Sequence, residues 1–380
     1  MIRTLPTRLE VTWTCPTDVP TAYDGSDGHR ASLLTLPTVR YRGSFALLDA
    51  EIQTVEQVMA TDLSGAYELP LAHEATPALV AITGTGVTVD ATYCDWIAVG
   101  RRVLVVAPSG SYTAAIAAAS GGSLTIDASP PATCPARTTH VYPLEPVLLD
   151  DGPTGRRWPV AAGEWSWTGR QLTDRAIGAA GATLTTFGSK VVLNRRPLGQ
   201  GNGQHLGGLR WLEAGGKAES LTAWARSRLR RDGSWAIRGA ADRQWAKALI
   251  AACRGRRAAF LRPTWRPDLT LYSQPAGAAS SIRVVEDFAA LWGGDLARQR
   301  LQLEYADGSV GYFAISTTSA GAGYTQLNLG SALPSSIPGG SVRVVSFLET
   351  VRLDDDAVTL TYNGSWTGSL ELTTLTIQET

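Results

Sequence analysis

The pattern of apolar and polar positions predicts many short strands. Leu9, Val11 and Trp13 alternate with polar neighbours, which is typical of a strand with one buried face. Other apolar runs are short and are broken by Gly, Pro and Ser, as in proteins built from strands and turns. They predict strands over 87–89, 96–99, 103–106, 112–116, 124–126, 141–149, 282–285, 301–305, 312–315, 327–329, 342–353, 358–362 and 370–377.

Two further segments predict hairpins, and a third predicts a loop. Residues 39–47 are expected to turn at Arg42–Gly43, and residues 227–237 at Asp232–Gly233, because such pairs favour tight turns. Residues 199–208 read GQGNGQHLGG, which predicts a flexible loop. This loop is either an exposed finger that reaches a partner or a plain surface connection.

Two short amphipathic helices interrupt the strands. Apolar residues recur every three or four positions over 49–63 and over 240–253, which predicts one apolar stripe along each helix. Both segments stop at a glycine-containing turn, a common signal for a helix C-terminus. The stripes consist of Ile52, Val55, Met59 and Leu63 in the first helix, and of Trp245, Leu249 and Cys253 in the second.

A series of landmarks occurs twice in the same order, which predicts an internal duplication. Each copy opens with Gly-Ser, an aromatic residue, Ala and an aliphatic residue, at 43–47 and 233–237. Then follow the helix, an aromatic residue with a proline, and a second Gly-Ser. Each copy closes on a strand with Leu-Glu and an Asp pair, at 141–151 and 345–355, and Trp-Thr-Gly follows both, at 167–169 and 366–368.

The length and the repeat together predict the domain organisation. A chain of 380 residues exceeds what one hydrophobic core usually serves. We predict a mainly β protein with two similar β-barrel- or sandwich-like domains, each with one short helix across its mouth or face. The expected parts are an N-terminal arm with strands over 1–38, a first β unit over 39–151, a Gly- and Trp-rich connecting segment over 152–225, and a second β unit with C-terminal strands over 226–380.

The charge balance narrows the range of partners. Lys plus Arg and Asp plus Glu number 34 each, so the formal net charge is zero and exerts no long-range attraction on nucleic acid or an anionic membrane. No apolar run reaches the length of a membrane span. We therefore expect no membrane span and no direct reading of nucleic-acid sequence. A chain with no net charge also lacks the electrostatic repulsion that keeps monomers apart, which favours association into an assembly.

Short catalytic motifs are missing from the chain. It has no G-x-S-x-G elbow and no Walker loop, and its histidines lack the spacing of a zinc protease. We therefore expect no enzymatic activity, and we assign no catalytic residue. The histidines are His29, His73, His140 and His205.

Metal and cofactor sites are not predicted either. The four cysteines form no C-x-x-C pair, so we expect small buried apolar side chains in a reducing compartment. Aspartates at 150–151 and 354–356 follow long strands, where Asx turns are commoner than the many oxygen ligands that calcium needs. No cofactor is expected. The cysteines are Cys15, Cys94, Cys134 and Cys253.

Two clusters of arginine are candidates for contact with a partner. Either cluster fits phosphate or an acidic patch on another subunit, or simply a solvated face. The first β unit has Ser64, Ala66 and Tyr67 where the second cluster stands, so the charge difference would let neighbours distinguish the units. The clusters are Arg226, Arg228, Arg230 and Arg231, and Arg254, Arg256 and Arg257.

Residues 260–271 (FLRPTWRPDLTL) and 342–355 (VRVVSFLETVRLDD) resemble the tail-tip and baseplate proteins of long-tailed, non-contractile bacteriophages. Residues 67–70 and 141–144 are similar to a degenerate copy. The resemblance implies a structural protein of the virion tail, a distal-tail or hub adaptor that joins the tail tube to host-recognition proteins. It also implies residence in the host cytoplasm during assembly. Some tail-hub proteins hold an iron–sulfur cluster through cysteines, but the cysteine spacing here does not extend that feature to this chain.

The repeat suggests how such a protein would assemble. Tail tubes are rings of six similar domains, so three copies of a two-unit chain would present six quasi-equivalent faces. We therefore predict a trimer with pseudo-sixfold symmetry that contacts the tail tube or other tail-tip proteins and receptor-binding proteins. An alternative is a carbohydrate- or receptor-binding tail module, and a cell-wall hydrolase with two carboxylates brought together by folding is less favoured. The sugar-stacking residues of the alternative would be Trp158, Trp165, Trp167, Trp211 and Trp224.

Overall fold

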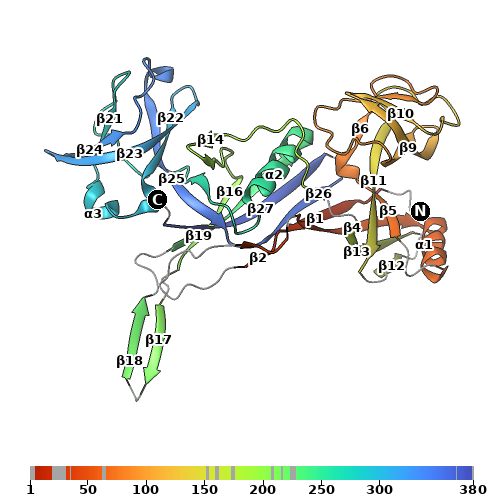
Figure 1. The fold of residues 1–380 in the computed structure, drawn as a ribbon, viewed down its shortest axis with the longest axis horizontal. Helices are drawn as coiled ribbons and strands as arrows, with labels where there is room; N and C mark the ends of the chain where they lie inside the picture. Colours follow the sequence, from red (N-terminus) through yellow and green to blue (C-terminus); the bar gives the residue numbers. More distant parts are fainter. Residues whose placement is uncertain are drawn as a thin grey trace.

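The computed structural model has a mainly β fold with one large antiparallel sheet. Two β lobes stand on one side of a central sheet, and the hairpin β17–β18 projects from the other side (Figure 1). The structure describes residues 5–18, 31–34, 36–61, 66–150, 154–158, 162–172, 176–206, 209–214, 217–222, 228–364 and 366–378.

The elements of the first half run from β1 to β15. They are β1 (Arg8–Thr14), β2 (Thr17–Asp18), β3 (Ala31–Ser32), β4 (Thr38–Leu48), α1 (Asp49–Thr61), β5 (Ala66–Pro70), the 3-10 helix η1 (Ala72–Glu74), β6 (Thr76–Pro77), β7 (Gly86–Thr88), β8 (Arg102–Ala107), β9 (Gly110–Ser120), β10 (Ser123–Ile126), β11 (His140–Leu149), β12 (Thr154–Trp158), β13 (Ala162–Gln171), β14 (Thr186–Phe187) and β15 (Lys190–Val191).

The second half continues from β16 to β27. Its elements are β16 (Gly199–Leu206), β17 (Leu209–Ala214), β18 (Lys217–Thr222), β19 (Arg228–Arg238), α2 (Gly239–Cys253), β20 (Phe260–Pro263), β21 (Ser281–Val284), α3 (Phe288–Trp292), η2 (Leu296–Arg298), β22 (Arg300–Tyr305), β23 (Val310–Gly321), β24 (Tyr324–Leu329), η3 (Pro338–Gly340), β25 (Val342–Leu353), β26 (Ala357–Asn363) and β27 (Thr367–Thr376).

The central sheet contains strands from both halves of the chain. Its pairings follow the order β12, β13, β4, β1, β26, β27, β19 and β16. Strand β1 lies between β4 of the first half and β26 of the second, so it joins the two halves. The long strands β11 and β25 pair with the central sheet at their C-terminal ends and continue into the lobes.

The strands of the two halves pair in the same pattern. Strand β11 pairs with β5, β8 and β13, and β25 pairs with β20, β22 and β27. The lobe strands β7, β8, β9 and β10 pair as β21, β22, β23 and β24 do. Registers agree as well, because Leu144 faces Pro70 in the first half and Leu348 faces Pro263 in the second.

Three main apolar clusters form the core. One cluster fills each lobe, and a third lies against the central sheet, where it combines residues of α1, α2 and strands from both halves. Among the described strands no closed barrel forms, so the barrel form of the prediction is not what the structure adopts. The strands instead join into one open sheet, since β1 connects the halves edge to edge.

Both predicted hairpins are wrong, because β4 and β19 are single continuous strands. Gly43 and Gly233 do not turn the chain; they leave room for indole rings. A methyl group at Gly43 would lie 2.8 Å from the Trp167 ring, and one at Gly233 would lie 2.5 Å from the Trp235 ring. Close packing against a large ring therefore explains a glycine within a strand at these positions.

The predicted loop over 199–208 is also wrong in part, because Gly199–Leu206 is a strand that pairs with β19. Its glycines coincide with a register irregularity between Gln200 and Gly203. The segment 96–99, predicted as a strand, forms turns. The Trp-Thr-Gly landmark does not match in register, since Trp167 faces Gly43 whereas Leu372 faces Gly233.

Both predicted helices are confirmed, as α1 and α2, within two residues of the expected ends. Helix α2 ends where Arg254 and Gly255 adopt positive φ angles of 49° and 64°, the left-handed conformation that stops many helices. In the part of the chain that the structure describes, no helix has the length and apolar character needed to cross a bilayer.

Candidate assembly interface

The junction between the two halves is the first feature of interest, because it shows how one half recognises the other. Its first component is the strand pair β1–β26, with seven opposed residue pairs from Arg8 and Asn363 to Thr14 and Ala357. Near its middle, the hydroxyl oxygens of Thr12 and Thr359 lie 2.8 Å apart. The two side chains thus face each other across the junction.

The second component is helix α2, which the first half covers. Lys247 Nζ lies 3.0 Å from Glu74 Oε1 and 2.7 Å from Asp95 Oδ2. Gln244 Nε2 donates to the Tyr93 carbonyl at 2.8 Å, and Arg243 donates to the carbonyl of His73. Buried cations of the second half therefore meet buried carboxylates of the first.

Burial and charge act in opposite directions within this cluster. Burial would raise the pKa of Glu74, but Lys247 and Arg243 outweigh it and hold that pKa far below its usual range. Burial lowers the pKa of His73 to about 3, so this ring is neutral at physiological pH. The His73 ring stacks on Tyr362 of β26 with centroids 4.3 Å apart. The cluster therefore depends on an ionised Glu74 and a neutral His73.

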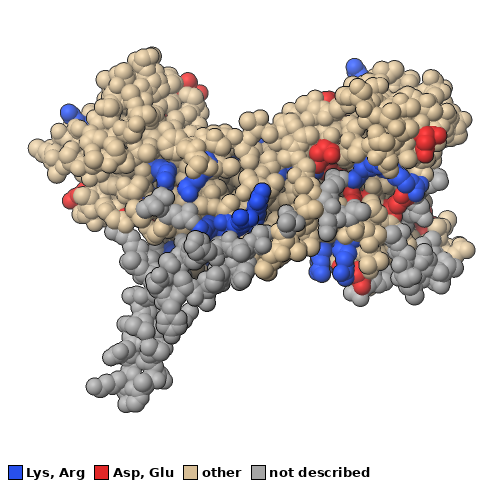
Figure 2. Space-filling view, viewed as in Figure 1, with Lys and Arg blue, Asp and Glu red and all other residues tan. Residues whose placement is uncertain are grey.

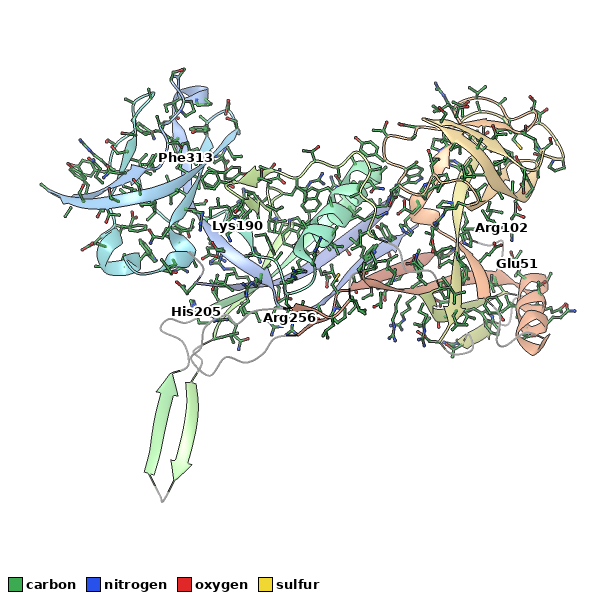
Figure 3. The ribbon with its side chains drawn as sticks, in the orientation of Figure 1. Glu51, Arg102, Lys190, His205, Arg256 and Phe313 are labelled. Carbon is green, nitrogen blue, oxygen red and sulfur yellow. The ribbon has the colours of Figure 1, made fainter. Side chains whose placement is uncertain are left out.

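The sheet has two open ends. Among the described strands, β12 pairs only with β13 and β16 pairs only with β19. Strand β12 corresponds to β26, and β16 corresponds to β1, the two strands that pair with each other inside the chain. Figure 3 shows Glu51 of α1 and His205 of β16 toward opposite ends of the long axis. The open edges thus repeat the two sides of the internal junction.

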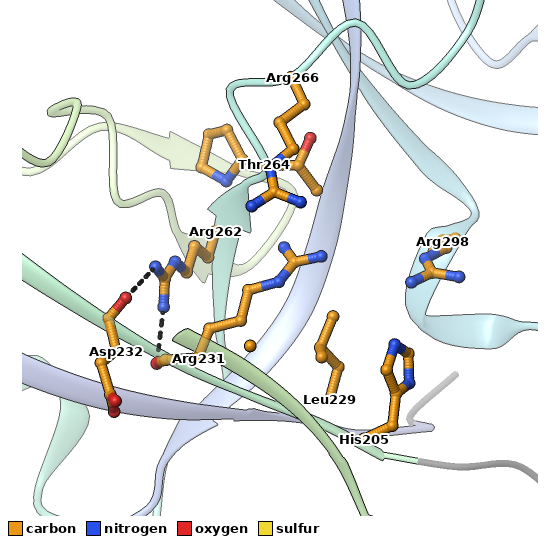
Figure 4. A pocket seen from close by; sticks show the side chains of 10 residues that line it. His205, Leu229, Arg231, Asp232, Arg262, Thr264, Arg266 and Arg298 are labelled. Atoms are coloured by element: carbon orange, nitrogen blue, oxygen red, sulfur yellow. Dashed lines mark hydrogen bonds between the residues drawn. The ribbon is translucent and has the colours of Figure 1, made fainter. Parts of the chain in front are cut away.

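A pocket rich in arginine lies beside β16. It has a volume of about 240 Å³, and four arginines line it together with His205 and Thr264. Figure 4 shows the guanidinium groups of Arg231 and Arg266 directed toward each other. On the face drawn in Figure 2, basic side chains gather below the left-hand lobe. The four arginines are Arg231, Arg262, Arg266 and Arg298.

Carboxylates contact the pocket arginines, and Asp295 Oδ2 lies 3.5 Å from Arg298 Nη1. Glu349 accepts from Arg231 at 2.7 Å and from Arg298 at 3.1 Å. Arg262 bonds to carbonyl oxygens, at 3.1 Å to Arg231 and 3.2 Å to Asp232, and the Asp232 carboxylate accepts from Thr373. Burial, and next the neighbouring Arg231, lower the pKa of Arg262 to about 10. Four guanidinium groups therefore line the pocket, and Glu349, Asp295 and Asp232 offset part of their charge.

The first half offers a direct comparison for this pocket. Glu145 holds the position of Glu349, since it faces Leu69 as Glu349 faces Arg262. Glu145 accepts from Arg101 and from the neutral Gln171. Glu349 instead accepts from Arg231 and Arg298, so the two halves differ in the partners of this buried carboxylate.

The histidines that the sequence singled out lie apart from one another. His73 belongs to the junction cluster, His205 lines the arginine pocket, and His140 packs beside Trp366 with ring centroids 6.4 Å apart. His29 lies outside the described residues. Among the described residues, no group of three or more His, Cys, Asp or Glu side chains could hold a metal ion.

The strand-end aspartates take part in ion pairs and turns. Asp150 pairs with Arg170 at 2.9 Å, and Asp354 pairs with Arg230 at 2.8 Å. The Asp355 carboxylate accepts from the Ala357 backbone, which is the Asx turn expected from the sequence. Asp151 lies outside the described residues.

The cysteine side chains divide into two kinds. Cys134 and Cys253 are buried in apolar clusters, as expected from the sequence. Cys15 and Cys94 are partly exposed, and burial raises the pKa of Cys94 to about 11. The four are free thiols.

The tryptophans and arginines proposed as contact residues separate in the structure. Trp167 is buried in the central core and Trp165 packs against it. Arg230 and Arg231 point to different partners, Asp354 and Glu349, as alternate residues of one strand do. The side chains of Trp158, Trp211, Trp224 and Arg226 lie outside the described parts.

Sequence reasoning missed three of the four pocket arginines as a site. Arg262 and Arg266 lie in the segment 260–271, which indicated only the family resemblance. Arg298 lies in no recognisable motif. Arg262 lies opposite Glu349 in the strand register and Arg298 donates to Glu349, so the folded structure, and not spacing along the chain, brings them together. No protein-family model matches this chain, and a search of curated proteins finds no similar sequence.

Proposed function

We propose that the chain is a structural ring component of a phage tail tip, a distal-tail or hub adaptor between the tail tube and host-recognition proteins. It would reside in the virion tail and pass through the host cytoplasm during assembly. The observation that carries the proposal is the strand β1, which joins two halves of equivalent pairing edge to edge. A chain of this kind would act by binding neighbouring subunits and would transform no substrate.

The equivalent pairings support descent of both halves from one β module. Unrelated segments would have to repeat a long series of antiparallel pairings by chance, including the register at Leu144 and Leu348. Both lobes also carry an irregular register in the pair β9–β10 and its counterpart β23–β24. A copied module accounts for all of these agreements at once.

The junction supports a closed ring. One half contacts the other through unlike surfaces, β1 with the 71–95 segment on one side and β26 with α2 on the other. Contacts between unlike surfaces continue from copy to copy, and they close into a ring if the rotation allows. Three copies of a two-unit chain would then form a trimer with pseudo-sixfold symmetry.

The carbohydrate-binding alternative is weaker, because Trp165 and Trp167 serve the core. Sugar binding needs aromatic faces at the surface, whereas Trp167 is 7% exposed. Receptor-binding proteins are therefore proposed as partners of the ring.

Native mass spectrometry of the purified chain tests the proposal. We expect a species of three chain masses, and particle images with six similar lobes around one axis. A chain that remains monomeric at assembly concentrations, or a ring of six copies, would contradict the proposed trimer.

A further inference from the structure

We infer that β16 of one copy pairs with β12 of a second copy, and that the exposed face of α1 in the second copy covers the arginine pocket of the first. This inference rests on the proposed ring and names the surfaces that form it. Its template is the junction inside the chain, where β1 pairs with β26 and the first half covers α2.

The strand registers specify the pairing. Gln204 faces Arg230 on β19 as Thr12 faces Arg40 on β4, and these arginines hold equivalent positions, so Gln204 takes the place of Thr12. Gly155 pairs on β13 opposite Trp165 as Leu360 pairs on β27 opposite Leu370.

Trp165 and Leu370 face the equivalent residues Phe45 and Trp235. Thr154, which precedes Gly155, therefore takes the place of Thr359. Because Thr12 faces Thr359 inside the chain, Gln204 is expected to face Thr154 of the next copy.

Helix exposure points to the same contact. Arg243, Gln244 and Lys247 of α2 are buried, at 2%, 0% and 5% exposure, where the first half covers them. The corresponding residues of α1 are Gln53, Thr54 and Gln57, and all are exposed. Within the part of the chain that the structure describes, helix α1 thus lacks the cover that α2 receives, and a second copy would supply it.

The surface that would cover α1 is the one around the arginine pocket. Leu71 donates its backbone N–H to Pro143, and Thr264 donates to Phe347, so the segment after β20 corresponds to the segment after β5. By this correspondence Arg266 holds the place of His73, next to Glu74, which contacts α2 inside the chain. The pocket therefore lies where α1 of a neighbour would sit.

The charges of the two junctions are reversed. Inside the chain, the cations of α2 meet the acidic Glu74 and Asp95. Between chains, the basic pocket would meet α1, which contains only acidic charged residues. Opposite polarity would prevent two first halves or two second halves from docking, because like charges would then meet. The acidic residues of α1 are Asp49, Glu51 and Glu56.

Cysteine crosslinking between two purified variants tests the register. Gln204→Cys and Thr154→Cys are mixed and oxidised, and opposed strand residues lie within the Cα separation that a disulfide spans. We expect a band at twice the chain mass on a non-reducing gel, absent from either variant alone. The pair Thr12→Cys and Thr359→Cys in one chain is the positive control, because it closes an internal bridge without a change in mass.

A mixture of Thr154→Cys with Thr318→Cys, an exposed position on β23, is the negative control and should give no such band. A trimer by mass without a Gln204–Thr154 crosslink would overturn the inferred edges and leave the proposed ring intact. A monomer by mass would overturn both. A crosslink at the expected pair, with a trimeric mass, supports both.

Discussion

At the scale of single residues, two glycines that predicted turns are packed against aromatic rings, and several charged residues are buried. Gly43 and Gly233 make room for indoles, and both adopt ordinary strand angles. His73 and Glu74 are buried beside cations from a helix distant in sequence. Individual side chains are thus constrained by partners that lie far away along the chain.

Gly233→Ala is expected to destabilise the protein by about 1–3 kcal/mol, because overpacking forces a shift in a filled site. The new methyl group would lie 2.5 Å from the Trp235 ring and 3.2 Å from an Arg262 nitrogen. Urea denaturation measures the change. Gly86→Ala is the matched control, since no atom lies within 4 Å of its new methyl group. Equal stabilities of the two variants would contradict the packing argument.

Stability is expected to fall as the pH drops from about 6.5 toward 3, through His73. The pKa of this ring is about 3 in the folded protein and 6.5 without burial, so only the unfolded chain binds the proton in this window. Glu74, with its lowered pKa, adds a loss in the same direction at more acidic pH.

His73→Phe keeps an aromatic ring on Tyr362 and removes the titration. The slope of unfolding free energy against pH should decrease by about 1.4 kcal/mol per pH unit between pH 6 and 4. Denaturant unfolding over a pH series measures this slope. An unchanged slope would show that His73 does not titrate as its burial requires.

At the scale of elements, equivalent helices have different surroundings. Helices α1 and α2 follow equivalent strands and bury similar apolar stripes, yet the first half covers the polar face of α2 whereas the matching face of α1 is exposed. Strand β1 likewise pairs on both sides, whereas its counterpart β16 pairs on one side among the described strands. An element's neighbours, more than its own pattern, decide whether its polar face is solvated.

Glu74→Gln is expected to destabilise the contact between η1 and α2 by about 3–5 kcal/mol, because it leaves Lys247 and Arg243 buried with less compensation. Thermal and denaturant unfolding measure the loss. Glu68→Gln is the control, since its pair with the half-exposed Arg102 contributes about 1 kcal/mol or less. Similar losses for both variants would refute the role of burial.

At the scale of the whole molecule, the first half has an open sheet edge at β12 and the second half has one at β16 among the described strands, and the surfaces beside these edges differ in charge. The arginine pocket adjoins β16, and the acidic helix α1 belongs to the half that ends in β12. Self-association through these two edges is expected to weaken as the salt concentration rises, because salt screens charges at exposed surfaces.

Gln53→Lys and Gln53→Glu test this polarity at an exposed position of α1 that corresponds to Arg243. Gln, Lys and Glu have similar helix propensities, so the helix itself should be little affected. The lysine should weaken self-association and the glutamate should strengthen it. Sedimentation at low and high salt measures both, and the same effect from both variants would contradict the charge argument.

Local patterns predicted much of the secondary structure. The alternation in 8–14, the apolar stripes of both helices and the long runs 141–149 and 342–353 each correspond to the observed elements. Apolar periodicity is sufficient for β1 and the helices because each buries one face, and the length of the apolar run is sufficient for β11 and β25 because both faces of these strands are largely buried. The pairs Arg42–Gly43 and Asp232–Gly233 were wrongly predicted to be turns. Each glycine instead packs against an indole ring that only the folded structure brings close to it.

The sequence by itself determined the mainly β class, the two helices and the order of the landmarks, because these depend on short-range spacing. Tertiary structure decided which edges are paired, which helix is covered and where arginines gather. Those properties depend on contacts between residues separated by up to hundreds of positions, such as Thr12 with Thr359 and Arg231 with Glu349. Apolar periodicity reflects only residues a few positions apart, so it does not predict contacts between residues far apart in the sequence.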